Sequence, residues 1–181
     1  YLTPHTLRNR PYNMNTEYLS VVDEHDQLIK TMPRHEIHAL GLRHRAVHIL
    51  VFNDKKQLFL QKRSMQKDLN KGLWDTSAAG HVDVGEDYES SAIREAEEEL
   101  GVNVEVTLQA LFKLSPTEQL GMEFIQVYRC QHNGPFALNK DEIDEGCWLS
   151  VAQITDRVKA NDISLTETFK VIWQHYLQSK L

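Results

Sequence analysis

Three closely spaced glutamates, Glu95, Glu98 and Glu99, are the residues of this chain best suited to bind a metal ion. Their spacing of i, i+3 and i+4 makes them neighbours on one face of an α-helix. Crowded carboxylates repel one another, and Gly101 places them in the last turn, where the helix dipole disfavours negative charge. A hard divalent cation such as Mg²⁺ prefers oxygen ligands and would offset this repulsion. The alternative is an ordinary acidic face exposed to water.

The helix that carries these glutamates also has an apolar side. At about 100° per residue, that side collects small and aliphatic residues, namely Ala92, Ile93, Ala96 and Leu100. The periodicity therefore predicts a helix that packs on a core and presents its acids on another face.

The segment around this helix has a fixed order of residue types. It reads GHVDVGEDYESSAIREAEEELGV, and its defined positions are Gly80, Glu86, Arg94, Glu95, Ala96, Glu98, Glu99, Gly101 and Val102. This pattern resembles the Nudix box at every defined position. The resemblance implies a Mg²⁺-dependent pyrophosphohydrolase that cleaves diphosphates linked to another moiety, with Mn²⁺ as a substitute metal. It also implies an α/β protein, the Nudix α/β/α sandwich with a mixed central sheet.

The same resemblance implies roles for the residues of the box. The metal ligands would be the three glutamates, together with the backbone carbonyl of Gly80. Glu98 and Glu95 are the leading candidates for the base that activates water, with Glu142 and Glu145 as further candidates. Arg94 would pair with a carboxylate and hold its rotamer, and Glu86 would tie the loop to the helix.

Outside the box, the chain is similar to Nudix members related to isopentenyl-diphosphate isomerase. The similarity lies in the segment QKRSMQK, in Trp74 and in the run Ala79-Gly80-His81. It implies that Arg63 and Lys67 contact the diphosphate of the substrate and that His81 binds a metal.

The departures from that isomerase favour hydrolysis. Ala79 stands where the isomerase has its catalytic cysteine, and its paired metal-binding glutamates match only as Gly121 and Glu123. Without a thiol, the proton chemistry of allylic isomerisation has no evident donor. An isomerase-like enzyme is therefore the alternative. A non-catalytic Nudix protein that binds nucleotide or RNA is a third reading, against which the complete set of box carboxylates argues.

The length, composition and net charge of the chain limit the kinds of molecule that it is expected to bind. Its 181 residues suit one domain, and its net charge of −6 offers no basic field for nucleic acid or an anionic membrane. The longest apolar run is too short to span a bilayer, and two distant cysteines suit a reducing compartment, so we expect a cytoplasmic protein. The expected partner is a small diphosphate substrate, by analogy a nucleoside diphosphate derivative, and a homodimer is left open.

Turn residues and apolar runs divide the chain into an arm over 1–17 and one domain over 18–181. We expect strands over 18–22, 27–31, 45–53, 57–63, 76–79, 104–113, 123–130 and 146–149, with 45–53 and 57–63 paired as a central hairpin. Two helices are expected to close the chain, over 151–160 and 166–178.

Four histidines between positions 33 and 48 are unusually dense: His35, His38, His44 and His48. Their spacing is not that of the zincin motif, although their density would suit a metal site. The alternative is that His44 lies at the rim of a strand and His48 within it, each hydrogen-bonded to neighbours.

Overall fold

The computed structural model describes residues 16–179, and most of the arm expected over 1–17 lies outside them. Seven strands form one mixed sheet in the order β5-β4-β3-β8-β7, with β6 paired to β3 and β9 paired to β4. The strands are β3 (His44–Phe52), β4 (Gln57–Arg63), β5 (Trp74–Asp75), β6 (Ala78–His81), β7 (Gln109–Leu114), β8 (Glu123–Gln131) and β9 (Ile143–Ser150). None of the described helices is both long and apolar enough to cross a membrane.

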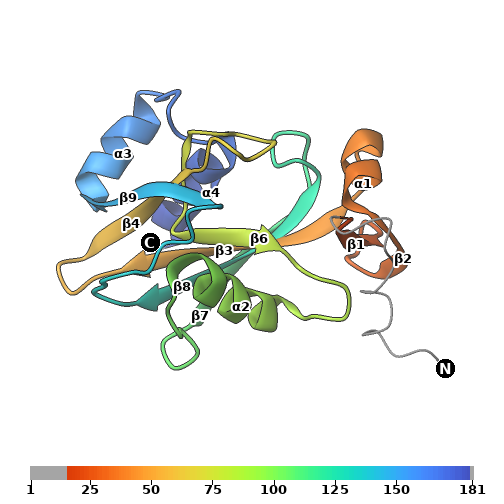
Figure 1. Ribbon diagram of the computed structural model, residues 1–181. Helices are drawn as coiled ribbons and strands as arrows, with labels where there is room; N and C mark the ends of the chain where they lie inside the picture. Colours follow the sequence, from red (N-terminus) through yellow and green to blue (C-terminus); the bar gives the residue numbers. More distant parts are fainter. Residues whose placement is uncertain (1–15, 180–181) are drawn as a thin grey trace.

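Helices cover both faces of this sheet, because alternate residues of a strand point to opposite sides. On β3, Ile49 packs with the apolar side of α2 (Tyr88–Leu100), whereas Leu50 packs with α3 (Val151–Lys159) and α4 (Glu167–Ser179). Figure 1 shows α2 on the opposite side of the sheet from α3 and α4. The predicted α/β/α sandwich with a mixed central sheet is therefore confirmed.

The predicted central hairpin is wrong beyond its turn. β3 and β4 are paired only at Phe52 and Leu58. β3 continues against β6 on one side and runs parallel to β8 on the other, while β4 turns to pair with β9 and β5. Apolar alternation is satisfied by any of these partners, so it cannot identify the neighbour. The separation of the two strands opens the sheet, and a cleft lies at that opening.

A hairpin and a short helix stand beside the sheet (Figure 1). Strands β1 (Tyr18–Val22) and β2 (Leu28–Pro33) pair antiparallel and lead into α1 (Arg34–Leu40), which the sequence does not predict. With seven residues and only Ile37 buried, α1 is too short to show a helical apolar repeat. Gly41 ends it in the left-handed conformation, with φ of 64°.

Asp26, in the turn between β1 and β2, joins this hairpin to the sheet and to α2. Its carboxylate accepts hydrogen bonds from Arg45 Nε at 2.6 Å, Tyr88 Oη at 2.6 Å and Lys113 Nζ at 2.7 Å. The side chain of Asp26 is 10% exposed, so these charge-assisted bonds are largely shielded from water. The three donors belong to β3, α2 and β7, so one carboxylate couples the hairpin to three elements.

We predict that Asp26→Asn lowers the free energy of unfolding by about 1–3 kcal/mol, because a near-isosteric amide cannot balance the two cations around it. Asparagine tolerates the positive φ of 60° at this position, so backbone strain does not confuse the result. Urea unfolding would measure the loss. Glu24→Gln removes the same charge from an exposed position of the same turn and should change stability by less than about 0.5 kcal/mol. Equal effects of the two changes would contradict the assignment.

Candidate active site

The cleft encloses about 1030 Å³. Its walls come from α1, the loop after β4, β6, the acidic side of α2, and the loops before β8 and β9. The cleft is lined by the residues to which the family resemblance assigns the main catalytic, substrate-binding and metal-binding roles: Arg63, Lys67, Gly80, His81, Arg94, Glu95, Glu98 and Glu99. Of the two further candidates for the base, Glu142 lines the cleft, whereas Glu145 is not among the described residues that do. The fold thus brings the residues of the box and the two cations together in one space.

Glu86 ties the loop after β6 to α2, as expected from the box. One carboxylate oxygen accepts the backbone N–H of Asp83 at 3.0 Å, the hydroxyl of Ser91 at 2.8 Å and Arg94 Nη2 at 2.9 Å. The other accepts Arg94 Nε at 2.9 Å. Because both oxygens of Glu86 are used, the start of the helix and its loop are held as one unit.

The guanidinium of Arg94 then reaches the acids of the site. Its Nη1 donates to Glu95 Oε1 at 2.8 Å and to Glu98 Oε2 at 3.1 Å, and its Nη2 donates to the carbonyl of His81 at 3.2 Å. Although burial opposes it, the surrounding carboxylates raise the pKa of Arg94 above its ordinary value. Arg94 is therefore a fixed cation that positions two of the three box glutamates.

Glu95 is largely buried, with 12% of its side chain exposed, and lies directly against Gly80. A Cβ at position 80 would stand 2.1 Å from Glu95 Oε1, so only glycine leaves room for this carboxylate. Burial, followed by repulsion from Glu99, raises the pKa of Glu95 to about 8. The side chains around Glu95 therefore supply too little positive charge to offset the burial of its carboxylate.

Glu99 is buried more deeply, at 5% exposure. Its Oε1 accepts the backbone N–H of Ala79 at 2.9 Å and Gln61 Nε2 at 3.1 Å. Burial raises the pKa of Glu99 to about 7, although these two hydrogen bonds act in the opposite direction. Gln61 was not identified from the sequence, since a glutamine on a strand carries no pattern that marks it as a partner of a distant glutamate.

Glu98 differs from the other two glutamates because 56% of its side chain is exposed. Its hydrogen bond to Arg94 is the only one that the side chain of Glu98 makes within residues 16–179. The three carboxylates therefore occupy three depths, with Glu99 innermost, Glu95 next and Glu98 at the solvent.

A cluster of three histidines lies on the other side of the cleft. Possible ligand atoms of His38, His44 and His81 all lie within 4.8 Å of one another. Glu123 joins them, with Oε1 at 3.1 Å from His81 Nε2 and 3.4 Å from His44 Nε2. The second contact lacks hydrogen-bond geometry, so the buried His44 Nε2 has no hydrogen-bond partner among the described residues. The sequence separates these residues by up to 85 positions, and α1, which supplies His38, was not predicted.

Two groups of this cluster, His38 and Glu123, have pKa values far from their ordinary ones. Burial, followed by the nearby Arg34, lowers the pKa of His38 to about 4. Although burial opposes it, His44 and His81 hold the pKa of Glu123 well below its usual range. A neutral His38 and an ionised Glu123 are in the protonation states in which an imidazole and a carboxylate ligate a metal.

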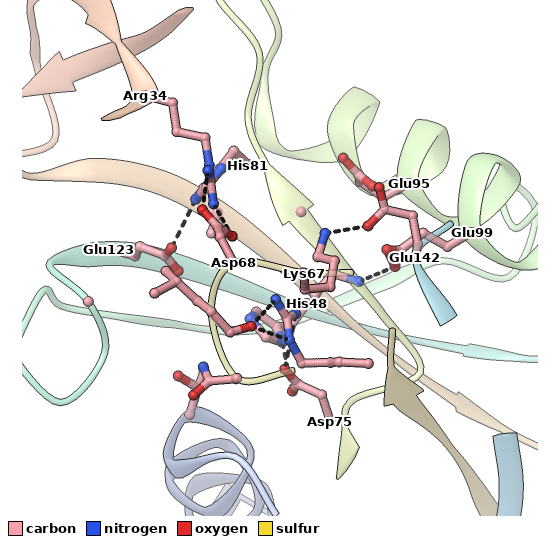
Figure 2. A pocket seen from close by; sticks show the side chains of 18 of the residues that line it. Arg34, His48, Lys67, Asp68, Asp75, His81, Glu95, Glu99, Glu123 and Glu142 are labelled. Carbon is pink, nitrogen blue, oxygen red and sulfur yellow. Dashed lines mark hydrogen bonds and ion pairs between the residues drawn. The ribbon is translucent and has the colours of Figure 1, made fainter. Parts of the chain in front are cut away.

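The cations of the cleft are already engaged by acids or carbonyls. Lys67 pairs with Glu142, and Arg34 makes a two-pronged contact with Asp68 at 2.7 and 3.1 Å (Figure 2). Arg63 Nε and Nη2 donate to the carbonyl of Leu69 at 3.2 and 3.0 Å. Arg34 was missed from the sequence because it lies on the unpredicted helix α1.

Sequence and fold both have counterparts among known proteins. The family profile described as the NUDIX domain matches residues 42–169. An uncharacterised Nudix hydrolase of Yersinia pestis is 38% identical over 142 residues, covering 78% of this chain and 77% of the relative. Isopentenyl-diphosphate Delta-isomerase 2 of Photorhabdus laumondii is 31% identical over 159 residues, covering 86% and 90%. The crystal structure of DR0079 from Deinococcus radiodurans is 31% identical, with a TM-score of 0.71, over 80% of this chain and 90% of that chain.

We predict that Gly80→Ala weakens Mn²⁺ binding about tenfold or more, because the new methyl group must displace the carboxylate of Glu95. Titration followed by electron paramagnetic resonance would measure free Mn²⁺. In a Glu95→Ala background the same change should add little further loss. A full additional loss in that background would show that Gly80 acts in some other way.

Proposed function

The chain belongs to the Nudix hydrolase family, which acts on acid anhydrides, and from that premise we propose that it is a divalent-metal-dependent hydrolase of a diphosphate linkage. The observation that carries the proposal is the set of box glutamates on α2, two of them buried, gathered on one wall of a large cleft. Lys67 and Arg63 stand in the same cleft as candidates to receive an anionic substrate.

The donor set fits a hard divalent cation. Burial raises the pKa values of Glu95 and Glu99, so both carboxylates would gain from a compensating positive charge, and all their donor atoms are oxygens. We assign Mg²⁺, with Mn²⁺ as a substitute, to Glu95, Glu98, Glu99 and the carbonyl of Gly80. When bound, such a cation neutralises phosphate oxygens and makes water more nucleophilic.

Within this site Glu98 is our first candidate for the general base. It is exposed to the cleft and held by a single hydrogen bond to Arg94, so one carboxylate oxygen is free to accept a proton. The water oxygen bonds to one phosphorus, the bridging P–O bond breaks, and the proton of the water passes to Glu98. Glu95 is the second candidate, while Glu142 is less suited because its carboxylate pairs with Lys67.

We assign the diphosphate of the substrate to Lys67 and Arg63. Lys67 Nζ would exchange Glu142 for a phosphate oxygen, and Arg63 would use Nη1, which makes no hydrogen bond within the described residues. The volume of about 1030 Å³ is enough for a nucleoside diphosphate derivative, the substrate class that we propose. Neither Cys130 nor Cys147 is among the described residues that line the cleft, which argues against the isomerase alternative.

We propose a second metal site at His81, with His38, His44 and Glu123 as its other ligands. His44 Nε2 supports the proposal, because it is buried and makes no hydrogen bond within the described residues, although Glu123 Oε1 lies 3.4 Å away. Such a nitrogen is unfavourable unless a ligand completes it. Three imidazoles and one carboxylate suit Mn²⁺, Zn²⁺ or Fe²⁺ better than Mg²⁺.

We expect Glu98→Gln to lower kcat by about 10²-fold or more, because the amide cannot accept the proton of the water. Phosphorus NMR with Mg²⁺ and a panel of nucleoside diphosphates, triphosphates, nucleotide sugars and isopentenyl diphosphate would report cleavage. Glu97→Gln is the matched control, since Glu97 is the exposed neighbour outside the cleft. Undiminished cleavage by Glu98→Gln would remove Glu98 from the mechanism, and absence of cleavage of every compound by the wild type would contradict a hydrolase.

For the histidine cluster, we expect His81→Ala to remove one tightly bound metal ion per chain, because it deletes a ligand and the partner of Glu123. Elemental analysis after dialysis against Mn²⁺ and Zn²⁺ would count the ions. His35→Ala is the control, since His35 is exposed on α1 and outside the cluster. The same metal content in both variants would show that the cluster is only a polar contact.

A further inference from the structure

Arg34 and Asp68 pair across the cleft from two of its walls. Arg34 begins α1, and Asp68 belongs to the loop between β4 and β5. Arg34 Nη1 donates to Asp68 Oδ2 at 2.7 Å, and Nη2 donates to Oδ1 at 3.1 Å (Figure 2). These two bonds occupy the fork of the guanidinium, through which an arginine also binds a phosphate. Asp68 therefore holds the part of Arg34 that an anionic ligand would need.

A second acid lies against the same guanidinium. Arg34 Nε is 3.6 Å from Glu17 Oε2, so each of its three nitrogens has a carboxylate oxygen nearby. The hydrogen bond from Arg34 lowers the pKa of Asp68 to about 2, so Asp68 stays ionised at neutral pH. The positive charge of Arg34 is thus balanced within the protein, although Arg34 lines the cleft.

The other cations of the cleft differ in how firmly they are held. Four arginine or lysine side chains are among the described residues that line it: Arg34, Arg63, Lys67 and Arg94. Arg94 is committed to the box glutamates, and Arg34 is committed to Asp68. Lys67 has a flexible stem and a single ion pair, and Arg63 Nη1 makes no hydrogen bond within the described residues. Two of the four cations are thus available to an anion, which matches a diphosphate.

The Arg34–Asp68 pair lies where a longer phosphate chain would extend. Asp68 follows Lys67 directly in the chain, and Figure 2 shows Lys67 between this pair and the box glutamates Glu95 and Glu99. A phosphoryl group beyond Lys67 would meet the carboxylate of Asp68, and like charges repel. To reach Arg34 it would have to displace two hydrogen bonds made by a partner that is tethered in the same chain.

We infer that Asp68 is a specificity-determining residue that keeps Arg34 from binding ligands and so restricts the cleft to two phosphoryl groups. The inference rests on the proposed function and adds to it the residue that limits the length of the phosphate chain. Asp68 makes no contact with the reacting atoms in this role. Its removal turns Arg34 into a third available cation, so the expected effect is a gain of binding.

Calorimetry with two base-free, non-hydrolysable analogues and Mg²⁺ tests the inference. Methylenediphosphonate carries two phosphorus atoms, and bis(methylene)triphosphonate carries three. Asp68→Asn should tighten binding of the triphosphonate about tenfold and of the diphosphonate less than about threefold, because only the longer chain reaches Arg34. Wild type should bind the triphosphonate no more than about threefold tighter than the diphosphonate.

Two control variants separate the release of Arg34 from a general change of charge. Glu118→Gln removes the same charge from an exposed residue of the cleft that pairs with no cation within the described chain. It should change the binding of both analogues by factors that agree within about twofold. Arg34→Gln combined with Asp68→Asn removes the whole pair at constant net charge and should restore the wild-type ratio of the two dissociation constants.

Three results would overturn the inference and leave the hydrolase in place. The first is a ratio that changes no more in Asp68→Asn than in Glu118→Gln, which would mean that Asp68 acts only through its charge. The second is a gain that persists when Arg34 is also replaced. The third is weaker binding of both analogues by Asp68→Asn, which would mean that Asp68 holds Arg34 in place for the ligand.

The wild-type protein separates this inference from the function on which it rests. If it binds neither analogue and cleaves no compound of the phosphorus NMR panel, the proposed function is contradicted. If it cleaves one of them but binds neither analogue, the hydrolase stands and the inference fails, because the cations then do not recognise a phosphate chain. Asp68 is 57% exposed, so its replacement should not disturb the fold. Thermal melting of Asp68→Asn and Asp68→Ser checks this, and the variant that melts like wild type decides.

Discussion

The site depends on one cation, Arg94, placed among four carboxylates. It contacts Asp83, Glu86, Glu95 and Glu98, so it fastens the loop after β6 to α2 and holds two glutamates toward the cleft. Four acids exceed the charge of one guanidinium, and Glu99 lies nearby with no arginine of its own. The protein thus gathers more carboxylates here than its own cations can balance, and this is the electrostatic basis on which we propose a divalent metal site.

The opening of the sheet forms the cleft that these carboxylates face. If β3 and β4 remained paired along their length, the sheet would be closed where the cleft now lies. Their separation after Phe52 and Leu58 instead lets β5 and β6 enter, and these two short strands deliver Asp75, Gly80 and His81 to the cleft. The irregular pairing of β3 and β4 is therefore what places these residues in the candidate active site.

Much of the candidate site could be predicted from the sequence because many of its residues lie close together along the chain. The spacing of Glu95, Glu98 and Glu99, with Arg94 beside them, is a local pattern that a helix converts directly into a surface. His38, His44 and Glu123 are brought to His81 only by tertiary structure, and no periodicity connects residues of α1, β3 and β8. The same holds for Gln61 and Arg34. Strand partners were misjudged for β3 and β4 because apolar alternation gives the face of a strand and not its neighbour.

The hairpin and α1 form a wall of the cleft that Asp26 joins to β3, α2 and β7. This wall supplies Arg34 and His38 to the cleft, while Arg94 fastens the box glutamates Glu95 and Glu98 through hydrogen bonds that involve no residue of the wall. A substitution of Arg34 can therefore change the charge of the cleft without removing a hydrogen bond of Glu95, Glu98 or Glu99. Variation at Arg34 is thus a route to a different substrate in which the box glutamates keep their partners.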